Sequence, residues 1–396
     1  MFDRLFENAV DLHGNMLCLA VRDGRFAGLA ATGDAFAAAE TIDLGGRLVL
    51  PGFVDGHIHL DKSFVGDRWQ PHLPAASLRE RLANEKRQLA RARPMVERAG
   101  ALIAQAAAFG TIAMRCHVDV DASTGLSHLH AVLEAREQWR DIVDIEIVAF
   151  PQAGVVSCPG TADMLEAAVR EGAAVVGGID PGTFDGDTEA QLDVVFGIAE
   201  RHGSKVDIHL HEPGAQGVEQ LLRIARRTKA LGMEGRVAVS HAYSLGEVPP
   251  EVVDRAAHAL AHAGVAIMTN APGDHSFPPV LRLREAGVRV FAGNDNIRDA
   301  WWPYGNGDML QRAMLVGYRS GFYTDEHLHV ALDMVTYAGA GAIGKGGYGL
   351  AIGNEATFVV LDAPNGAAAV AGAPAERVVV RRGEYEGQPF APASPA

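Results

Sequence analysis

Hydrophobic and polar positions follow two alternating patterns along most of this chain. Short runs rich in β-branched residues predict strands, and longer stretches with apolar residues three and four positions apart predict helices. The expected strands cover 48–59, 111–120, 142–150, 173–180, 205–211, 236–242, 264–270 and 287–295. The expected helices between them cover 162–171, 188–202, 215–231, 249–263 and 277–286.

Eight strands that alternate with helices predict parallel β/α units, and eight such units close into a barrel. An open doubly wound sheet is the alternative, but that fold requires a glycine-rich nucleotide-type turn after its first strand. No such turn follows 48–59 in this sequence. We therefore expect an α/β protein with a (β/α)8 TIM barrel over residues 51–345.

The two ends of the chain show a different pattern. Asp23-Gly24 separates two strand-like runs within 17–29 and is a typical β-hairpin turn. Residues 355–362 and 377–384 are also strand-like. We expect the two end segments to pair into one small β-sandwich-like domain. That domain covers 1–50 and 346–396. The last residues, 388–396, are rich in proline and alanine, and we expect them to be disordered.

Length and composition fit a soluble globular protein of one large and one small domain, with 396 residues of which 48% are hydrophobic. No apolar stretch reaches the roughly 18 residues that span a bilayer. The first residues lack the basic and apolar regions of a signal peptide. The three cysteines are widely spaced and suggest no disulfide framework. We therefore expect a cytoplasmic protein with no membrane partner, and we expect it to form a homo-oligomer.

A formal net charge of −14 argues against a nucleic-acid surface, which requires clustered lysines and arginines. The arginines of 79–98 are interleaved with Glu80, Glu85 and Glu97, a pattern that predicts a solvated helix face. We also expect the histidines on helical stretches to be surface groups. These are His128, His130, His258 and His262.

Candidate metal ligands stand at the ends of the predicted strands, where the active sites of this fold lie. His57 and His59 are two positions apart on a strand, so their side chains point to the same side. Imidazole is the commonest protein ligand for zinc and related metals. His209 and Asp295 follow at later strand ends. Three imidazoles and one carboxylate suit Zn²⁺ or Fe²⁺ and leave room for a water.

Other strand ends also carry polar side chains. They are His117, Asp119, Gln152, Asp180, His211, Glu212, Ser240 and His241. His211 shares the strand face of His209 and is a rival or auxiliary ligand. His117 and Asp119 could orient a ligand imidazole. The strand at 173–180 has no lysine that could be carbamylated and bridge two metals, so we expect a single-metal site.

These motifs resemble the amidohydrolase superfamily, in the branch that contains cytosine deaminase and N-isopropylammelide isopropylamidohydrolase. The match runs over nearly the whole chain. It is carried by Asp61-Lys62-Ser63-Phe64, His117-Val118-Asp119-Val120-Asp121, Val148-Ala149-Phe150-Pro151-Gln152, Val176-Gly177-Gly178-Ile179-Asp180-Pro181, Ser240-His241 and Asp295-Asn296-Ile297-Arg298-Asp299. The resemblance implies one divalent metal bound by His57, His59, His209 and Asp295. It also implies that His241 acts beside the metal water and that Gln152 orients the ring amide of the substrate.

Two positions point to different substrates within that branch. Glu212 stands three residues after His209, as in proteins similar to cytosine deaminase, where a glutamate moves protons to the ring nitrogen and leaving amine. The isopropylammelide enzymes lack this glutamate but are closer in the segments that begin at Asp61 and Asp295. Asn296 stands where cytosine deaminases carry an aspartate that helps to recognise the pyrimidine ring.

The resemblance implies a hydrolase of carbon–nitrogen bonds. Its substrate would be a nitrogen heterocycle such as an aminopyrimidine or aminotriazine, and it would release ammonia or an alkylamine. The predicted catalytic residues are Glu212, His241, Asp295 and Lys62. The predicted substrate contacts are Gln152, Asn296, Trp301 and Trp302.

Several of these assignments have an alternative. Lys62 could give a proton or hold an anionic substrate, or it could be a solvated loop lysine. Trp301 and Trp302 could stack on a planar ring or pack under their loop. A metal-binding scaffold or sensor without turnover is the alternative function.

Overall fold

The computed structural model describes residues 1–396 except 32–35, 77, 274 and 386–396. Two compact units make up the chain. One comprises Met1–Val54, Ala106–Ile112 and Asp308–Ala396, and the other comprises Asp55–Gln105 and Ala113–Gly307. The domain boundaries expected at residues 51 and 345 stay a prediction. The expected disorder of 388–396 lies outside the described residues.

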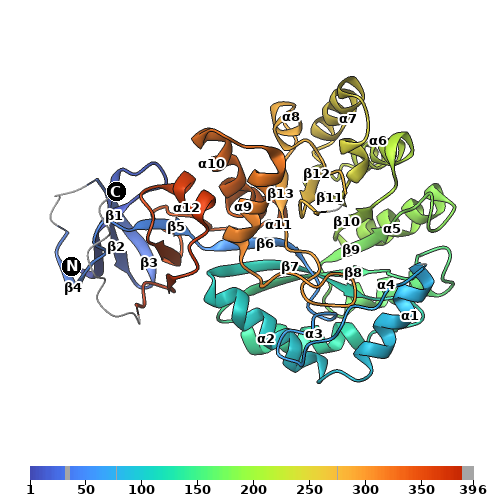
Figure 1. The fold of residues 1–396 in the computed structure, drawn as a ribbon, viewed down its shortest axis with the longest axis horizontal. Coiled ribbons are helices and arrows are strands. Elements are labelled where there is room, and N and C mark those ends of the chain that lie inside the picture. The colour runs from blue at the N-terminus through green and yellow to red at the C-terminus, as the bar shows by residue number, and fades with distance from the viewer. Residues whose placement is uncertain (32–35, 77, 274, 386–396) are drawn as a thin grey trace. The chain divides into compact units, whose positions relative to one another are not determined.

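Eight parallel strands follow one another in a single sheet, in the order of the sequence (Figure 1). They are β6 (Phe53–Ile58), β7 (Thr111–Asp119), β8 (Asp144–Phe150), β9 (Val175–Ile179), β10 (Lys205–Leu210), β11 (Val237–His241), β12 (Ala266–Thr269) and β13 (Val290–Ala292). A parallel bridge between Ile58 and Asp295 joins β6 to the segment after β13, so the sheet nearly closes. This confirms the predicted (β/α)8 barrel and rules out the open doubly wound sheet.

Helices follow the strands, as the alternation of patterns predicts. After β7 to β12 come α3 (Ser127–Trp139), α4 (Thr161–Arg170), α5 (Thr188–His202), α6 (Gly214–Ala230), α7 (Pro250–His262) and α8 (Val280–Glu285). The apolar residues of α6 show why: Val218, Leu221 and Ile224 recur every third position and are all buried. Two further helices, α1 (Leu78–Leu89) and α2 (Met95–Ala108), lie between β6 and β7 in the sequence.

The first predicted strand, 48–59, is wrong in one respect because it is two strands. β5 (Leu48–Pro51) pairs with strands from the chain ends, and β6 starts only at Phe53. Gly52 separates the two, and a Cβ there would lie 2.5 Å from a methyl carbon of Ile112. Both strands are buried throughout and apolar on each side of Gly52, so the hydrophobic pattern does not reveal the break.

Strands from both chain ends form a second, seven-stranded sheet. Its members besides β5 are β1 (Phe2–Val10), β2 (Met16–Arg22), β3 (Arg25–Ala30), β4 (Ala38–Asp43), β14 (Phe358–Leu361) and β15 (Arg377–Val380). The predicted hairpin turn joins β2 to β3, and its residues Asp23 and Gly24 both have positive φ. Phe6 and Phe358 meet edge to face in its core, with ring centroids 5.1 Å apart. The expected pairing of strands from both chain ends into one β-sheet is confirmed.

Four helices of the C-terminal part were not predicted from the sequence. They are α9 (Met309–Ser320), α10 (Asp325–Met334), α11 (Tyr337–Ile343) and α12 (Gly366–Gly372). Across the described residues, no helix has the length and apolar character needed to cross a membrane. Cys18, Cys116 and Cys158 are all free thiols.

Candidate metal centre and active site

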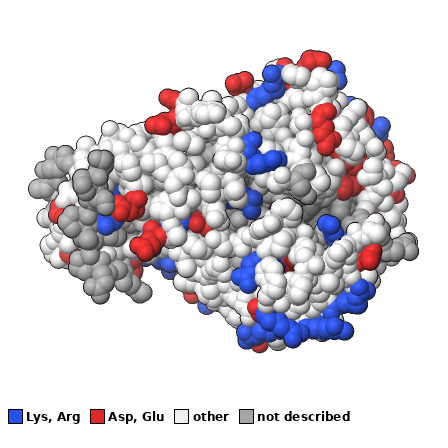
Figure 2. Space-filling model, viewed as in Figure 1, with Lys and Arg blue, Asp and Glu red and all other residues white. Residues whose placement is uncertain are grey.

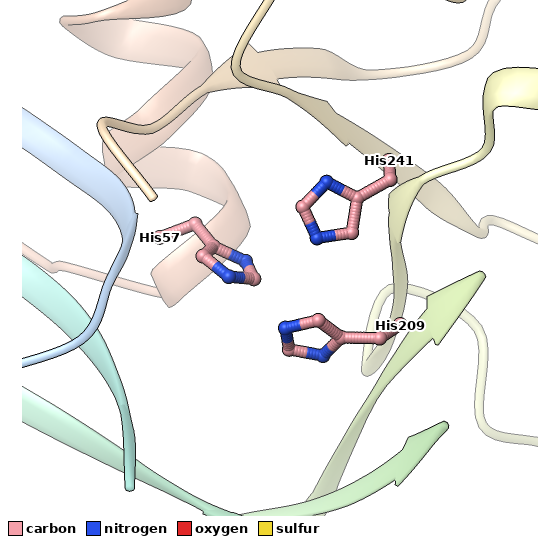
Figure 3. A group of neighbouring side chains, drawn as sticks. All are labelled: His57, His209 and His241. Atoms are coloured by element: carbon pink, nitrogen blue, oxygen red, sulfur yellow. The ribbon is translucent and has the colours of Figure 1, made fainter. Parts of the chain in front are cut away.

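Three imidazoles from three strands meet inside the barrel unit (Figure 3). His57 comes from β6, His209 from β10 and His241 from β11, and one ring nitrogen of each lies within 4.8 Å of the others. His57 belongs to a second such group with His59 and Asp295. All five residues are buried. The structure thus brings the four predicted ligands and His241 together at one point.

Hydrogen bonds fix which nitrogen His57 turns toward this cluster. Its Nδ1 lies 2.9 Å from Ser240 Oγ, and that hydroxyl donates to Asp207 Oδ1 at 2.7 Å. Because the hydroxyl proton is used on Asp207, the oxygen accepts from His57 Nδ1–H. The unprotonated Nε2 of His57 therefore faces the cluster, 3.5 Å from Asp295 Oδ1.

His59 is oriented in the same way by a backbone group. Its Nδ1 lies 3.0 Å from the carbonyl oxygen of His117, which can only accept a hydrogen bond. His59 Nε2 is the nitrogen left for the cluster, and it lies 3.3 Å from Asp295 Oδ1. His117 was expected to orient a ligand through its side chain, but the bond comes from its main chain. Its ring stacks on that of His57, with centroids 3.7 Å apart.

The Asp207 carboxylate continues this network away from the cluster. Its Oδ2 accepts from Arg115 Nη1 at 2.9 Å, and Arg115 also pairs with Glu146 at 2.6 Å. Asp207 and Arg115 are both buried, so the ion pair holds the carboxylate rigidly behind Ser240. The sequence interpretation assigned no role to Arg115. The one available signal was Asp207, which stands two positions before His209 on the same strand face.

The donor set fits a divalent cation. Both ring nitrogens of His209 are buried and have no hydrogen-bond partner among the described residues. A buried polar group without a partner is costly, and a bound cation would supply that partner. Burial, and next the nearby His57, holds the pKa of His209 well below its ordinary value. The imidazole is therefore neutral, which is the form that binds metals.

His211 and Glu212 follow His209 at the end of β10 and are held by the loop after β9. His211 Nδ1 lies 2.8 Å from Asp180 Oδ2, and its ring stacks on that of His241 with centroids 4.5 Å apart. Glu212 Oε1 accepts from the backbone N–H groups of Gly182 and Thr183, at 2.7 and 2.6 Å. Its Oε2 is buried and has no hydrogen-bond partner among the described residues.

His241 has an unusual backbone conformation for a residue with a side chain. Its φ is +75°, in the left-handed region that costs energy outside glycine and is often found at functional sites. Tyr243 Oη lies 3.3 Å from its Nδ1, so Nε2 is the nitrogen left for the cluster. The ring points toward His57 and His209 (Figure 3).

Lys62 is buried, with only 1% of its surface exposed, and is not a solvated loop lysine. Its Nζ lies 2.9 Å from Asp119 Oδ1, 2.6 Å from Gln152 Oε1 and 4.0 Å from Glu85 Oε1. Glu85 belongs to α1, where a solvated face was predicted. Figure 2 shows basic side chains gathered near α1, but Glu85 is turned inward and is 3% exposed. The expectation of a solvated face is wrong for this residue.

Each predicted substrate contact of the loop after β13 contacts another side chain of the protein. Asn296 Nδ2 donates to Asp299 Oδ2 at 2.6 Å, and burial raises the pKa of that carboxyl to about 7. Trp301 Nε1 donates to Glu85 Oε1 at 2.8 Å. The Trp302 ring lies 5.4 Å from that of the exposed Tyr304. Their roles as substrate contacts stay a prediction.

His128 is not the surface group that its helical position predicted. It is partly buried, and its Nδ1 lies 2.8 Å from Asp61 Oδ2. Asp61, Asp119 and His128 offer ligand atoms within 4.8 Å of one another. Both carboxylates of this group already have a basic partner, because His128 pairs with Asp61 and Lys62 pairs with Asp119. A cavity of about 550 Å³ lies beside it and is lined by Glu85, Asp119, His128 and Gln152 among others.

Comparison with known proteins places the chain in a family. A family model described as the amidohydrolase family matches residues 40–388. The chain belongs to the amidohydrolase family. This confirms the family predicted from the motifs and the predicted enzyme class, a hydrolase of carbon–nitrogen bonds. The family is metal-dependent, in agreement with the buried histidine and aspartate cluster.

Individual relatives of this amidohydrolase cover most of its length. It is 35% identical over 333 residues to the N-isopropylammelide isopropyl amidohydrolase of Pseudomonas sp. (strain ADP), covering 82% of each chain. The structure of N-isopropylammelide isopropylaminohydrolase from Burkholderia multivorans matches with TM-score 0.92 and 41% identity, over 97% of this chain and 98% of that chain. The 5-methylcytosine deaminase of Klebsiella pneumoniae matches with TM-score 0.86 and 28% identity, over 98% of both chains.

Removing the Ser240 hydroxyl tests whether the Asp207 network prepares this amidohydrolase for a cation. Ser240→Ala leaves His57 Nδ1 and Asp207 Oδ1 without their shared partner. We expect metal affinity to fall about 10- to 100-fold, the usual effect of losing such an outer partner. A competition titration with a chelator of known affinity measures this change.

Ser244→Ala is the matched control. Ser244 is also buried, and its hydroxyl has no hydrogen-bond partner among the described residues. Its replacement should leave metal affinity unchanged. Equal losses in the two variants would show that the effect is general loosening, and would refute a specific role for Ser240.

Proposed function

We propose that this amidohydrolase hydrolyses the exocyclic C–N bond of a nitrogen heterocycle, an aminopyrimidine or an aminotriazine, and releases ammonia or an alkylamine. The observation that carries the proposal is the cluster of His57, His209 and His241, whose ring nitrogens are buried and face one another. The Burkholderia and Klebsiella structures support it, since their names specify N-isopropylammelide and 5-methylcytosine.

One divalent cation, Zn²⁺ or Fe²⁺, would be held by His57, His59, His209 and Asp295. A bound cation of this kind lowers the pKa of water toward about 7 and so supplies a nucleophile at neutral pH. His57 and His59 are suited to this role because their Nδ1 atoms are engaged elsewhere, so both Nε2 atoms face the cluster.

His241 and Asp295 would handle the proton of the attacking water. Asp295 Oδ1 lies between His57 and His59, at 3.5 and 3.3 Å. The Nε2 of His241 is the ring nitrogen left free by Tyr243, and it can take a proton and stabilise charge on the attacked carbon centre.

Glu212 would deliver protons to the ring nitrogen and to the departing amine. Two backbone N–H groups hold its Oε1, so the carboxylate stays in one orientation. Its Oε2 has no partner among the described residues and is the atom available for proton transfer. The reaction then balances: a C–O bond forms and the exocyclic C–N bond breaks, one proton of the water leaves on the amine, and the other stays on the ring nitrogen of the oxo product.

A substrate panel tests the proposed function. We expect protein loaded with Zn²⁺ or Fe²⁺ to release ammonia or an alkylamine from at least one member of a set of aminopyrimidines, N-alkylaminotriazines and pterins. An equal amount of the oxo product should form. The same protein treated with a chelator is the control.

The panel also separates catalysis from the alternative function. Metal-loaded, folded protein that releases no amine from any member would refute the proposal and favour a scaffold or sensor. The metal identity, a homo-oligomeric assembly and a cytoplasmic location stay predictions.

A further inference from the structure

The contact between Lys62 and Gln152 determines how the Gln152 amide is oriented. Lys62 Nζ lies 2.6 Å from Gln152 Oε1. An ammonium group carries donors only, so the amide atom that faces it must be the oxygen. The two N–H bonds of Gln152 therefore point away from Lys62. A turned amide would place donor against donor and lose a hydrogen bond to a charged group.

Neighbouring carboxylates keep Lys62 charged and in place. Asp119 Oδ1 lies 2.9 Å from its Nζ and Glu85 Oε1 lies 4.0 Å away, and both residues are buried. Although burial lowers it, Asp119 and Glu85 raise the pKa of Lys62 above its ordinary value. Trp301 holds Glu85 through a hydrogen bond of 2.8 Å. With 1% of its surface exposed, Lys62 offers no free face to an anionic substrate.

Gln152 borders open space that a substrate could enter. It lines the cavity of about 550 Å³ and is 8% exposed, while its oxygen is occupied by Lys62. Phe150, two residues earlier, stacks on the ring of His209 with centroids 4.0 Å apart. Lys62 Nζ lies 5.4 Å from the centre of the same Phe150 ring. Phe150 thus connects the lysine–glutamine pair to the cluster of predicted metal ligands.

We propose that Lys62 is a positioning residue that holds the Gln152 amide with its N–H groups toward the substrate. The site then selects a heterocycle with an oxo group facing Gln152 over one with an amino group there, because an oxo group accepts and an amino group donates. The inference rests on the proposed function, and it adds the substrate chemistry that the cluster alone does not specify.

Symmetric triazines make the selectivity measurable. With the alkylamino group at the metal site, the two remaining ring positions carry the same substituent, so Gln152 meets that substituent in either orientation of the ring. We compare kcat/KM for amine release from a 2-alkylamino-4,6-dioxo ring and a 2-alkylamino-4,6-diamino ring. The wild-type protein should prefer the dioxo ring by about 100-fold or more. Lys62→Met removes the donors and lets the amide turn, so this preference should fall by about 10-fold or more.

Two further variants separate positioning from general loosening. Glu85→Gln disturbs the same buried cluster but leaves the bond between Lys62 and Gln152, so the preference should persist even if overall activity falls. Gln152→Glu keeps a partner for Lys62 and replaces the N–H groups by an acceptor, so the preference should reverse. Gln152→Glu adds a counter-charge to Lys62, so it tests the inference even if Lys62→Met does not fold.

Binding of a trioxo triazine, which has no amine to lose, gives a readout that does not depend on turnover. Calorimetric affinity for this ring should fall about 10-fold or more in Lys62→Met and Gln152→Glu, and should hold in Glu85→Gln. Amine release with an unchanged preference in Lys62→Met and Gln152→Glu would overturn the inference and leave the proposed function intact. If the wild type releases no amine, binding of the trioxo ring tests the inference instead. Loss of affinity in both variants supports the inference. Absence of binding, or unchanged affinity in the variants, overturns it.

Discussion

Replacing His209 with asparagine is expected to give a folded protein that binds little metal and has lost at least about 1,000-fold in kcat/KM for amine release. A bound cation contributes several kcal/mol to stabilising the transition state, and three powers of ten correspond to about 4 kcal/mol. Both nitrogens of His209 are buried and lack a hydrogen-bond partner among the described residues, and a bound cation would supply a partner for one of them. Elemental analysis after gel filtration and steady-state kinetics measure the two effects.

His117 supplies the matched control for His209. It is equally buried, and its two ring nitrogens also have no hydrogen-bond partner among the described residues. Unlike His209, it belongs to no group whose ligand atoms lie within 4.8 Å of one another among the described residues, so His117→Asn should retain stoichiometric metal in whatever fraction of protein is folded. Metal loss in His117→Asn together with retention in His209→Asn would overturn the proposed ligand set.

Chelation of the wild-type protein tests the same point without a mutation. Removal of the metal should abolish amine release and lower the midpoint of thermal unfolding, because a cation that binds only the folded state stabilises it by mass action. Adding back Zn²⁺ or Fe²⁺ should restore both properties, and the metal that restores the higher turnover identifies the better cofactor. Full activity after exhaustive chelation would remove the metal from the mechanism.

The sequence predicted the barrel well because each β/α unit repeats the same change of pattern. The strand predicted at 205–211 is observed as Lys205–Leu210, and the helix predicted at 188–202 is observed as Thr188–His202. The pattern failed at 48–59, where β5 and β6 belong to different sheets but are equally buried. Hydrophobicity reports burial and not the identity of the neighbouring strand.

The candidate site was predictable to the extent that it depends on strand ends. His57, His209 and Asp295 are far apart in sequence, yet the barrel topology alone brings strand ends to one rim. Pairings outside that rule were not predictable. Glu85 reaches Lys62 from a helix, and His128 reaches Asp61 from another helix. Such contacts depend on how each helix packs, and no spacing in the sequence encodes that.

Replacing Glu212 with glutamine is expected to leave the fold and the metal content intact and to lower kcat by about 100- to 10,000-fold. That range is the usual contribution of a positioned acid or base. Glutamine has nearly the same shape, and its oxygen can still accept from the backbone N–H groups of Gly182 and Thr183. It cannot carry a proton between ring nitrogen and amine. Steady-state kinetics on the best panel substrate, with metal analysis of the same sample, measure the result.

Thr183→Val separates the chemistry of Glu212 from its placement. The Thr183 hydroxyl lies 3.2 Å from Glu212 Oε1, and the variant removes this one contact while both backbone bonds remain. We expect a loss of less than about 10-fold, in line with one neutral hydrogen bond. If Glu212→Gln keeps near-normal kcat, proton transfer does not pass through Glu212. If Thr183→Val loses as much as Glu212→Gln, the orientation of the carboxylate and not its proton limits the rate. A large loss in Glu212→Gln alone is the result that assigns proton transfer to the Glu212 carboxylate.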